Sequence, residues 1–165
     1  MPKISAIVHT ENDALRIGRL LDSLRACDEV LVVDHNSQDD TIKIARKHGA
    51  TVKKGLPGVE PGAYLMDARN NWILCVHPNE ALNESLEGSL HEFKERKDEE
   101  ETAQAYNVAV REEAAGGWRT EASETRLANR AKVNWTTELP PAMKDVPTLP
   151  GELMRFAEPP AAKTA

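Results

Sequence analysis

Apolar positions in the first half of the chain alternate between nearly continuous runs and a helical spacing. Nearly continuous apolar runs occupy residues 4–8 and 29–34, as is typical of strands covered on both faces. Between them, a helix over residues 13–27 is predicted, with Asn12 as its cap, because apolar residues recur every three or four positions at Ile17, Leu20, Leu21 and Leu24. This order of strand, helix and strand indicates a βαβ unit.

A second unit of the same kind follows. Ser37 and Asp40 have a capping-box-like spacing and Gly49 supplies a stop, so residues 37–49 are expected to form a helix. Residues 50–55 are expected to form a short third strand. Strands that alternate with helices in this way form a parallel sheet with right-handed crossovers, so the sequence predicts an α/β fold.

The middle of the chain continues this pattern after a loop rich in Pro and Gly at residues 56–62. One or two helical turns are expected over residues 63–69, and a fourth strand over residues 72–76. After Pro78, one apolar stripe predicts a helix; it consists of Leu82, Leu86, Leu90 and Phe93. The charge run at residues 94–101 is expected to be the solvated end of that helix and a turn.

A different pattern begins at residue 103. Residues 103–110 alternate between apolar and polar, and residues 124–135 support one or two further strands after a turn, so a small antiparallel addition to the sheet is predicted. Six of the ten prolines lie in the last stretch. We therefore expect a single domain over residues 1–138 and a Pro-rich, partly disordered tail over residues 139–165.

The composition of the 165 residues is that of a globular protein, with 40% hydrophobic and 29% charged residues. The net charge of -6 argues against a nucleic-acid partner held by phosphate contacts. Cys27 and Cys75 lie in apolar stretches without CxxC spacing, which is typical of reduced cysteines in a cytoplasmic protein. No apolar run has the length of a transmembrane segment or a signal peptide, although a partner could hold the protein at the inner face of a membrane.

Polar residues gather where three of the predicted strands end. The sequence reads HTEN after residue 8, DHNSQDDT from residue 34 and HPNE after residue 76. In an open parallel sheet, ligands bind outside the carboxyl ends of the strands, near the point where the strand order reverses. The sequence therefore predicts a ligand site at this edge. It contains no GxGxxG and no GxxxxGK[ST], so it gives no support to a dinucleotide fingerprint or a P-loop.

A set of residues at fixed spacing runs from the first predicted strand to the end of the second predicted helix. The set consists of Thr10, Asn12, Leu21, Ser23, Leu24, Asp28, Glu29, Val32, Val33, Asp34, Ser37, Asp39, Thr41, Ala45, Gly49 and Ala50. This pattern resembles the opening of family 2 glycosyltransferases, which have T-x-N-E, L-x-S-L, D-E-(apolar)-V-V-D-x-x-S-x-D-x-T and A-x-x-x-G-A in that order. Residues 116–140 are similar to the acceptor-side segment of the lipopolysaccharide-core-type branch, so the resemblance covers residues 4 to about 138.

The resemblance implies a GT-A fold and transfer of a sugar, with inversion, from a UDP-, GDP- or ADP-linked nucleotide sugar to a glycan or lipid-linked acceptor. It implies that Asp34 hydrogen-bonds the base or ribose, that Thr10, Glu11 and Asn12 lie close beside it, and that Asp39 belongs to the same nucleotide-sugar-binding set. In the family, a D-x-D pair holds a divalent cation, Mg²⁺ or Mn²⁺, on the diphosphate, where it offsets the charge of the leaving group.

The chain departs from the family at the D-x-D motif. His77, Pro78 and Asn79 occupy these positions, and Glu80 occupies the acidic position after them. Mg²⁺ prefers anionic oxygen ligands, whereas His77 and Asn79 could bind a softer ion such as Mn²⁺ or Zn²⁺. The alternative is that Asn79 and Glu80 cap the following helix.

Several roles remain open from the sequence. The family has a carboxylate on the acceptor side that deprotonates the incoming hydroxyl, for which Glu138 and Glu124 are the candidates. The pattern around Glu138 by itself favours an exposed loop residue. Asp34 either binds a nucleotide or caps its own loop. An approach of His35 to His77 across the sheet edge would add a pair of titratable groups there. The chain is either an active glycosyltransferase or a degenerate module that binds a nucleotide or a protein partner without turnover.

Overall fold

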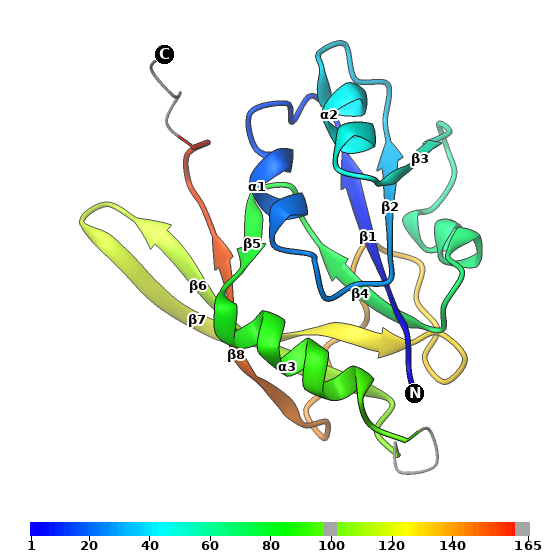
Figure 1. The fold of residues 1–165 in the computed structure, drawn as a ribbon, viewed down its shortest axis with the longest axis vertical. Coiled ribbons are helices and arrows are strands. Elements are labelled where there is room, and N and C mark those ends of the chain that lie inside the picture. The colour runs from blue at the N-terminus through cyan, green and yellow to red at the C-terminus, as the bar shows by residue number, and fades with distance from the viewer. Residues whose placement is uncertain (98–101, 161–165) are drawn as a thin grey trace.

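One mixed sheet forms the centre of the protein in the computed structural model, which describes residues 1–97 and 102–160 (Figure 1). In spatial order, the sheet contains β3 (Thr51–Lys54), β2 (Glu29–Asp34), β1 (Ile4–Thr10), β4 (Trp72–Val76), β7 (Gly117–Asn129), β6 (Ala105–Ala114), β8 (Thr148–Arg155) and β5 (Glu80–Leu82). The helices are α1 (Ile17–Asp22), α2 (Thr41–Lys47) and α3 (Glu84–Lys94), together with the 3₁₀ helix η1 (Pro61–Asp67).

The first half of the sheet is parallel, as the sequence predicted. β1 pairs with β2 on one side and with β4 on the other, and β2 pairs with β3, all in parallel. The chain therefore moves outward from β1 to β3 and then returns to the opposite side of β1. This return makes the carboxyl ends of β1 and β4 the point where the strand order reverses, which is the place where such sheets bind ligands.

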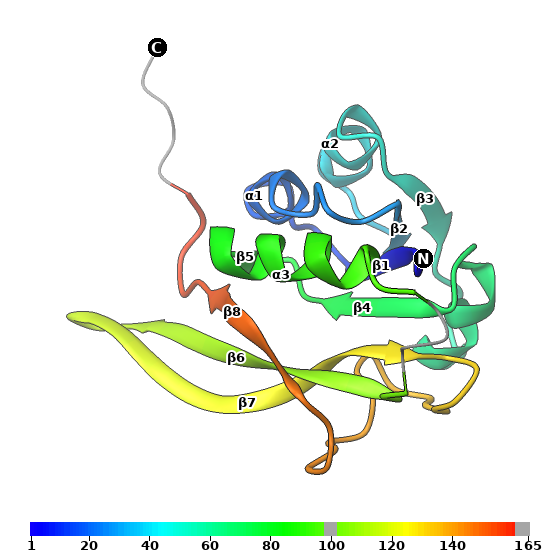
Figure 2. The same ribbon diagram turned by 60° about the horizontal axis from the view of Figure 1, so that its bottom comes forward.

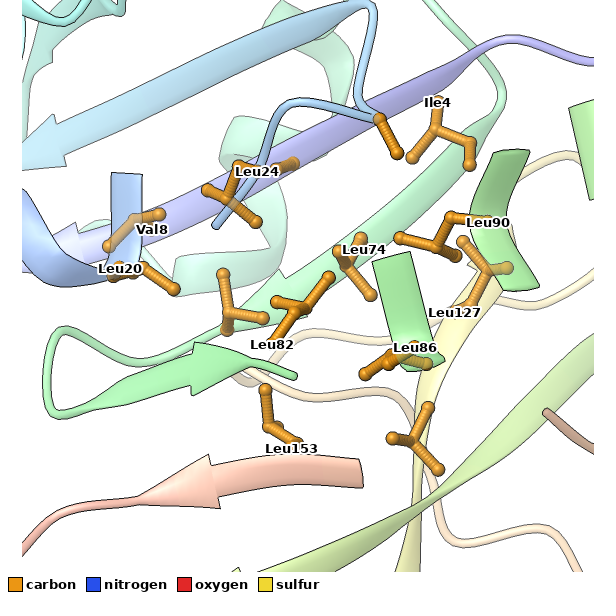
Figure 3. Close-up of a cluster of buried hydrophobic side chains, with 14 of the residues drawn as sticks. Ile4, Val8, Leu20, Leu24, Leu74, Leu82, Leu86, Leu90, Leu127 and Leu153 are labelled. Carbon is orange, nitrogen blue, oxygen red and sulfur yellow. The ribbon is translucent and has the colours of Figure 1, made fainter. Parts of the chain in front are cut away.

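The two faces of the parallel half are covered differently (Figure 2). Residues of β1 alternate between the faces, so that Ile4, Ala6 and Val8 pack with α1, α2 and α3, while Ile7 packs with η1 and with Trp135. Figure 3 shows aliphatic side chains from several elements converging in the first cluster; among them are Leu20, Leu74, Leu86, Leu90 and Leu127. Both faces are thus buried, which explains the nearly continuous apolar runs in the sequence.

The second half of the sheet is mostly antiparallel. β7 pairs antiparallel with β4 and β6, whereas β8 runs parallel to β6 and antiparallel to β5. The β6–β7 hairpin extends well beyond the helices, as both ribbon views show (Figures 1 and 2). The predicted fold class is confirmed: parallel pairings predominate in a sheet that is flanked by helices and carries an antiparallel addition.

The first predicted helix is shorter in the structure than in the sequence-based prediction. α1 spans Ile17–Asp22, and Arg16 rather than Asn12 occupies the N-cap position. Asn12 has a φ of 54°, in the left-handed region, and its side chain accepts a hydrogen bond from the Gln38 backbone instead. Asparagine tolerates this backbone conformation better than most residues, so Asn12 forms a turn and not a helix cap.

The helix after Pro78 also begins later than expected. Glu80 lies in the short strand β5, and the prediction that Asn79 and Glu80 cap the helix is wrong. The cap of α3 is Asn83, whose Oδ1 accepts a hydrogen bond from the Leu86 backbone N–H at 3.0 Å. The same oxygen accepts a bond from the Glu152 backbone N–H of β8, also at 3.0 Å, so this cap also joins α3 to the sheet.

The prediction of a tail after residue 138 is wrong for residues 148–155, which form β8. Leu149 and Leu153 of this strand are buried in the core. Gly151 has a φ of 105°, and a Cβ at this position would lie 2.2 Å from the Leu86 backbone nitrogen, so glycine allows β8 to pass close to α3. Residues 98–101 of the charge run and residues 161–165 of the predicted tail lie outside the described residues.

Within the described ranges, no helix combines the length and apolar character needed to cross a bilayer.

Candidate functional site

The loops that follow β1 and β2 are hydrogen-bonded to each other at the carboxyl edge of the sheet. The Asn12 backbone N–H donates to the Ser37 hydroxyl at 2.9 Å, and the Gln38 backbone N–H donates to Asn12 Oδ1 at 2.7 Å. The Asp13 backbone N–H donates to Thr41 Oγ1 at 2.9 Å. Residues of the T-x-N and S-x-D-x-T motifs therefore interlock these two loops.

Two of the predicted nucleotide-binding carboxylates anchor this arrangement. Asp34 is buried at the end of β2, where Oδ2 accepts a bond from the Ser37 backbone N–H at 3.0 Å and Oδ1 accepts one from the Ser37 hydroxyl at 2.6 Å. Asp39 is exposed and accepts bonds from the backbone N–H groups of Ala14 and Thr41. Partial desolvation would raise the pKa of Asp39, but hydrogen bonds from Thr41 and Ala14 outweigh it and lower the pKa.

The remaining members of the predicted nucleotide set lie in the same place. Thr10 is buried, and its hydroxyl donates to Asp13 Oδ2 at 2.7 Å. Glu11 has an exposed side chain, and its backbone N–H donates to the same Asp13 oxygen at 3.1 Å. The register pairs Thr10 with Asp34, so the structure brings the predicted residues of the two strand ends together.

A group of aromatic side chains lies beside these loops. His9 Nδ1 and His35 Nε2 are 3.0 Å apart, within hydrogen-bond distance, and the two rings are stacked with centroids 5.3 Å apart. Tyr64 of η1 lies edge-on to both rings, and its hydroxyl accepts a bond from the Leu56 backbone N–H at 2.7 Å. Burial lowers the pKa of His9, and the nearby His35 and His77 lower it further against an opposing effect of Glu138. The sequence had suggested an approach of His35 to His77, but in the structure His35 pairs with His9.

His77 and Glu138, predicted for different roles, lie next to each other. Glu138 Oε2 is 3.4 Å from His77 Nδ1, and the side chains are 45% and 29% exposed, respectively. Burial lowers the pKa of His77, although the nearby carboxylates of Glu80 and Glu138 oppose this shift. The segment after β7 therefore returns to the end of β4, where it places a half-exposed carboxylate at the point of strand-order reversal.

Glu80 belongs to a buried ionic cluster that the sequence did not reveal. Its side chain and that of Arg126 are both 0% exposed, and two bonds of 2.8 Å join the guanidinium to the two carboxylate oxygens. Arg155 donates to Glu80 at 3.2 Å and to Glu124 at 2.8 Å, and Glu80 also accepts a bond from the His77 backbone N–H. This cluster ties β5, β7 and β8 to the end of β4.

The same ionic cluster includes Glu124 and keeps its carboxylate charged. Desolvation would raise the pKa of Glu124, but the hydrogen bond from Arg155 and the charges of Arg126 and Arg155 outweigh it and lower the pKa. A carboxylate held in its charged form by two guanidinium groups is a weak proton acceptor. Of the two candidate bases, Glu138 has the more exposed side chain, 45% against 31% for Glu124.

The side chains at the D-x-D positions do not fit a divalent cation. His77 Nδ1 faces Glu138, and both Glu80 oxygens already accept bonds from arginine. Within residues 1–97 and 102–160, no group of three or more His, Cys, Asp or Glu residues could hold a metal ion. Asn79 is partly buried and its backbone carbonyl accepts a bond from Phe156, so it adds no anionic ligand.

Comparisons with known proteins agree with the fold. The crystal structure of S. aureus TarS aligns with a TM-score of 0.51 and 25% identity over 74% of this chain and 24% of that one. The crystal structure of mannosyl-3-phosphoglycerate synthase from Rubrobacter xylanophilus aligns with a TM-score of 0.52 and 21% identity over 70% of this chain and 41% of that one. The fold is GT-A-like.

Curated proteins from Rickettsia species are similar to part of the chain. The protein from Rickettsia felis is 39% identical over 94 residues and the one from Rickettsia prowazekii is 37% identical over 95 residues; each match covers 54% of this chain. Both are named as uncharacterized glycosyltransferases. The chain spans about a third of their length, 33% and 32% respectively. No protein-family model matches the chain.

Proposed function

We propose that the chain acts as a family 2 glycosyltransferase of the lipopolysaccharide-core-type branch, transferring a sugar from a nucleotide sugar to a glycan or lipid-linked acceptor. The observation that carries the proposal is the interlocking of the loops after β1 and β2 by the motif residues Asn12, Ser37 and Asp39. This interlock fixes the polar residues at the carboxyl edge of a GT-A-like sheet. A fixed arrangement of polar groups lowers the entropic cost of binding a ligand there.

The nucleotide would lie against the ends of β1 and β2. Asp34 uses one lone pair on each oxygen for Ser37, and a carboxylate has further acceptor capacity for the N–H or hydroxyl groups of a nucleoside. His9, His35 and Tyr64 form an aromatic group at the same strand ends, on the face of the sheet that η1 covers. In this arrangement the loop-anchoring role of Asp34 and its nucleotide-binding role operate together.

Glu138 is our candidate for the proton acceptor. In the transfer step, the acceptor hydroxyl oxygen attacks the anomeric carbon and its proton passes to the Glu138 carboxylate, while the bond from the anomeric carbon to the diphosphate breaks. The nucleoside diphosphate leaves with the bonding electrons, and the anomeric configuration inverts. Glu138 is suited to this role because it is 45% exposed and its ion-pair partner among the described residues is His77, 3.4 Å away.

The proposal can be tested by calorimetric binding and by transfer assays on the full chain. UDP, GDP and ADP are titrated first, and the corresponding sugar nucleotides are then assayed with Mg²⁺, with Mn²⁺ and with EDTA. We expect binding of at least one nucleotide and turnover of its sugar derivative, with turnover lost in Glu138→Gln. Binding without turnover on any donor would instead indicate the binding module, and the absence of both would refute the proposal.

A matched pair of variants separates the two roles of Asp34. Ser37→Ala removes a hydrogen-bond partner of Asp34 and of the Asn12 backbone but keeps the carboxylate, whereas Asp34→Asn removes the charge. Charge-assisted hydrogen bonds are worth about 1.5–3 kcal/mol each, so Asp34→Asn should weaken nucleotide binding about tenfold or more. If both variants lose nucleotide affinity to the same extent, Asp34 acts only by holding its loop.

A further inference from the structure

A cavity of about 490 Å³ lies at the opposite, amino-terminal edge of the sheet. It is formed where β1 and β4 begin and where β7 ends, and its lining includes Lys3, Arg69, Asn71, Trp72, Asn129 and Lys132. The register pairs Ile4 with Trp72 and Trp72 with Asn129, so adjacent strands hold these parts of the lining together. Cavities of this size accommodate small organic ligands.

The charge of this lining is opposite to that of the whole protein. Lys3, Arg69 and Lys132 contribute three cations in a chain with a net charge of -6. Arg69 uses Nε and its backbone N–H to bind the Glu29 carboxylate, which leaves both Nη groups without a partner in the described ranges. The ammonium groups of Lys3 and Lys132 likewise have no ion-pair or hydrogen-bond partner among residues 1–97 and 102–160.

Two of the three asparagine side chains around the cavity, Asn71 and Asn129, have the same bias, whereas Asn70 donates its Nδ2 to the Ser5 hydroxyl. Asn71 Oδ1 accepts a bond from Arg130, and Asn129 Oδ1 accepts one from the Ala131 backbone. Their Nδ2 groups have no partner in the described part of the chain. The acceptor atoms of these two amides are therefore engaged, whereas hydrogen-bond donors around the cavity remain available.

We propose that this cavity binds the phosphate group of a small phosphorylated molecule. A ligand with several acceptor oxygens and no donor requirement matches the available guanidinium, ammonium and amide N–H groups. A phosphate would also add negative charge beside Lys3, Lys132 and Arg69, whose Nε already binds the Glu29 carboxylate. The site lies at the opposite end of the strands from the proposed nucleotide edge and is independent of the proposed function.

Titrations monitored by NMR can test this site. The ¹⁵N-labelled full chain is titrated with inorganic phosphate, ribose 5-phosphate and ribose, each against sodium chloride at matched ionic strength. We expect saturable shifts of the Asn71 and Asn129 side-chain NH₂ signals with both phosphates. Lys3→Gln/Lys132→Gln should raise the dissociation constants at least tenfold, and nucleotide binding at Asp34 should be unaffected.

Lys43→Gln/Lys47→Gln is the matched control, because it removes two exposed lysines from α2, away from the cavity lining. This variant should bind both phosphates within twofold of the wild type. Equal weakening in the two double variants would show that only net charge matters and would overturn the proposal. Shifts that sodium chloride or unphosphorylated ribose reproduces would overturn it as well, and melting curves would confirm that both variants are folded.

Discussion

Replacing Glu80 by Gln removes one buried charge while preserving the shape of the side chain. Glu80 is 0% exposed and binds Arg126, also 0% exposed, through two bonds of 2.8 Å. It also accepts bonds from Arg155 and from the His77 backbone N–H. In the variant, an amide NH₂ replaces one carboxylate oxygen and faces a guanidinium, so a donor meets a donor in a dry environment.

The expected loss of stability is large. Removing one partner of a buried ion pair costs about 3–5 kcal/mol, because the remaining charge stays buried without compensation. Arg126 would retain Glu124 and the Cys75 carbonyl, which places the expected loss near the lower end, at about 3 kcal/mol. With a urea m-value of about 2 kcal/mol/M, this corresponds to a decrease of about 1.5 M in the unfolding midpoint.

Urea unfolding followed by circular dichroism measures this effect. Arg25→Gln is the matched control, since it also breaks an Arg–Glu pair, but one in which the arginine side chain is 75% exposed. Its midpoint should stay close to that of the wild type, because solvent screens such a pair. A decrease of less than about 0.5 M for Glu80→Gln, about 1 kcal/mol, would refute the view that this cluster is essential to the second half of the sheet.

Three further predictions concern local features. Because burial lowers the pKa of His9 below 6.5, unfolding should take up protons, and stability should fall as the pH decreases from about 6.5 towards the lowered value. The difference in melting temperature between pH 7.5 and pH 5.5 should therefore be smaller in His9→Gln than in the wild type. Gly151→Ala should lower the free energy of unfolding in urea by more than about 2 kcal/mol, since it combines a positive φ with a clash against Leu86. Gly88→Ala, in an unobstructed helical position, should instead raise it by about 0.5–1 kcal/mol. Asn83→Ala should cost about 1–2 kcal/mol by the same measurement, and Asn83→Asp, which keeps the cap acceptor, should cost much less.

The parallel half of the fold could be predicted from local sequence patterns. Strands covered on both faces have nearly continuous apolar runs, so β2 over Glu29–Asp34 was predicted with the bounds that the structure shows. Gly49 has a φ of 84°, as its predicted role in ending α2 requires. Because parallel strands bring their carboxyl ends to one edge, the meeting of Thr10 with Asp34 also followed from the sequence.

The second half could not be predicted in this way, since its features depend on contacts between distant segments. Nothing local distinguishes Glu80 as a strand residue; it lies in β5 because β8, more than 70 residues later, pairs with it at Arg155. Irregular pairing between Tyr106 and Asn107 shifts the register of β6 against β7 close to Arg126. Such a shift changes the faces on which the following residues lie, so alternation alone cannot show which charges are buried.

The same distinction between local pattern and distant contact applies to the candidate site. The sequence by itself determined that polar residues would gather at the ends of β1, β2 and β4, because the order of strands and helices fixes which ends share an edge. Only the tertiary structure decided their partners: His9 pairs with His35, and Glu138 lies beside His77. A hydrogen bond or an ion pair depends on distances of a few ångströms between segments that the chain brings together only when it folds.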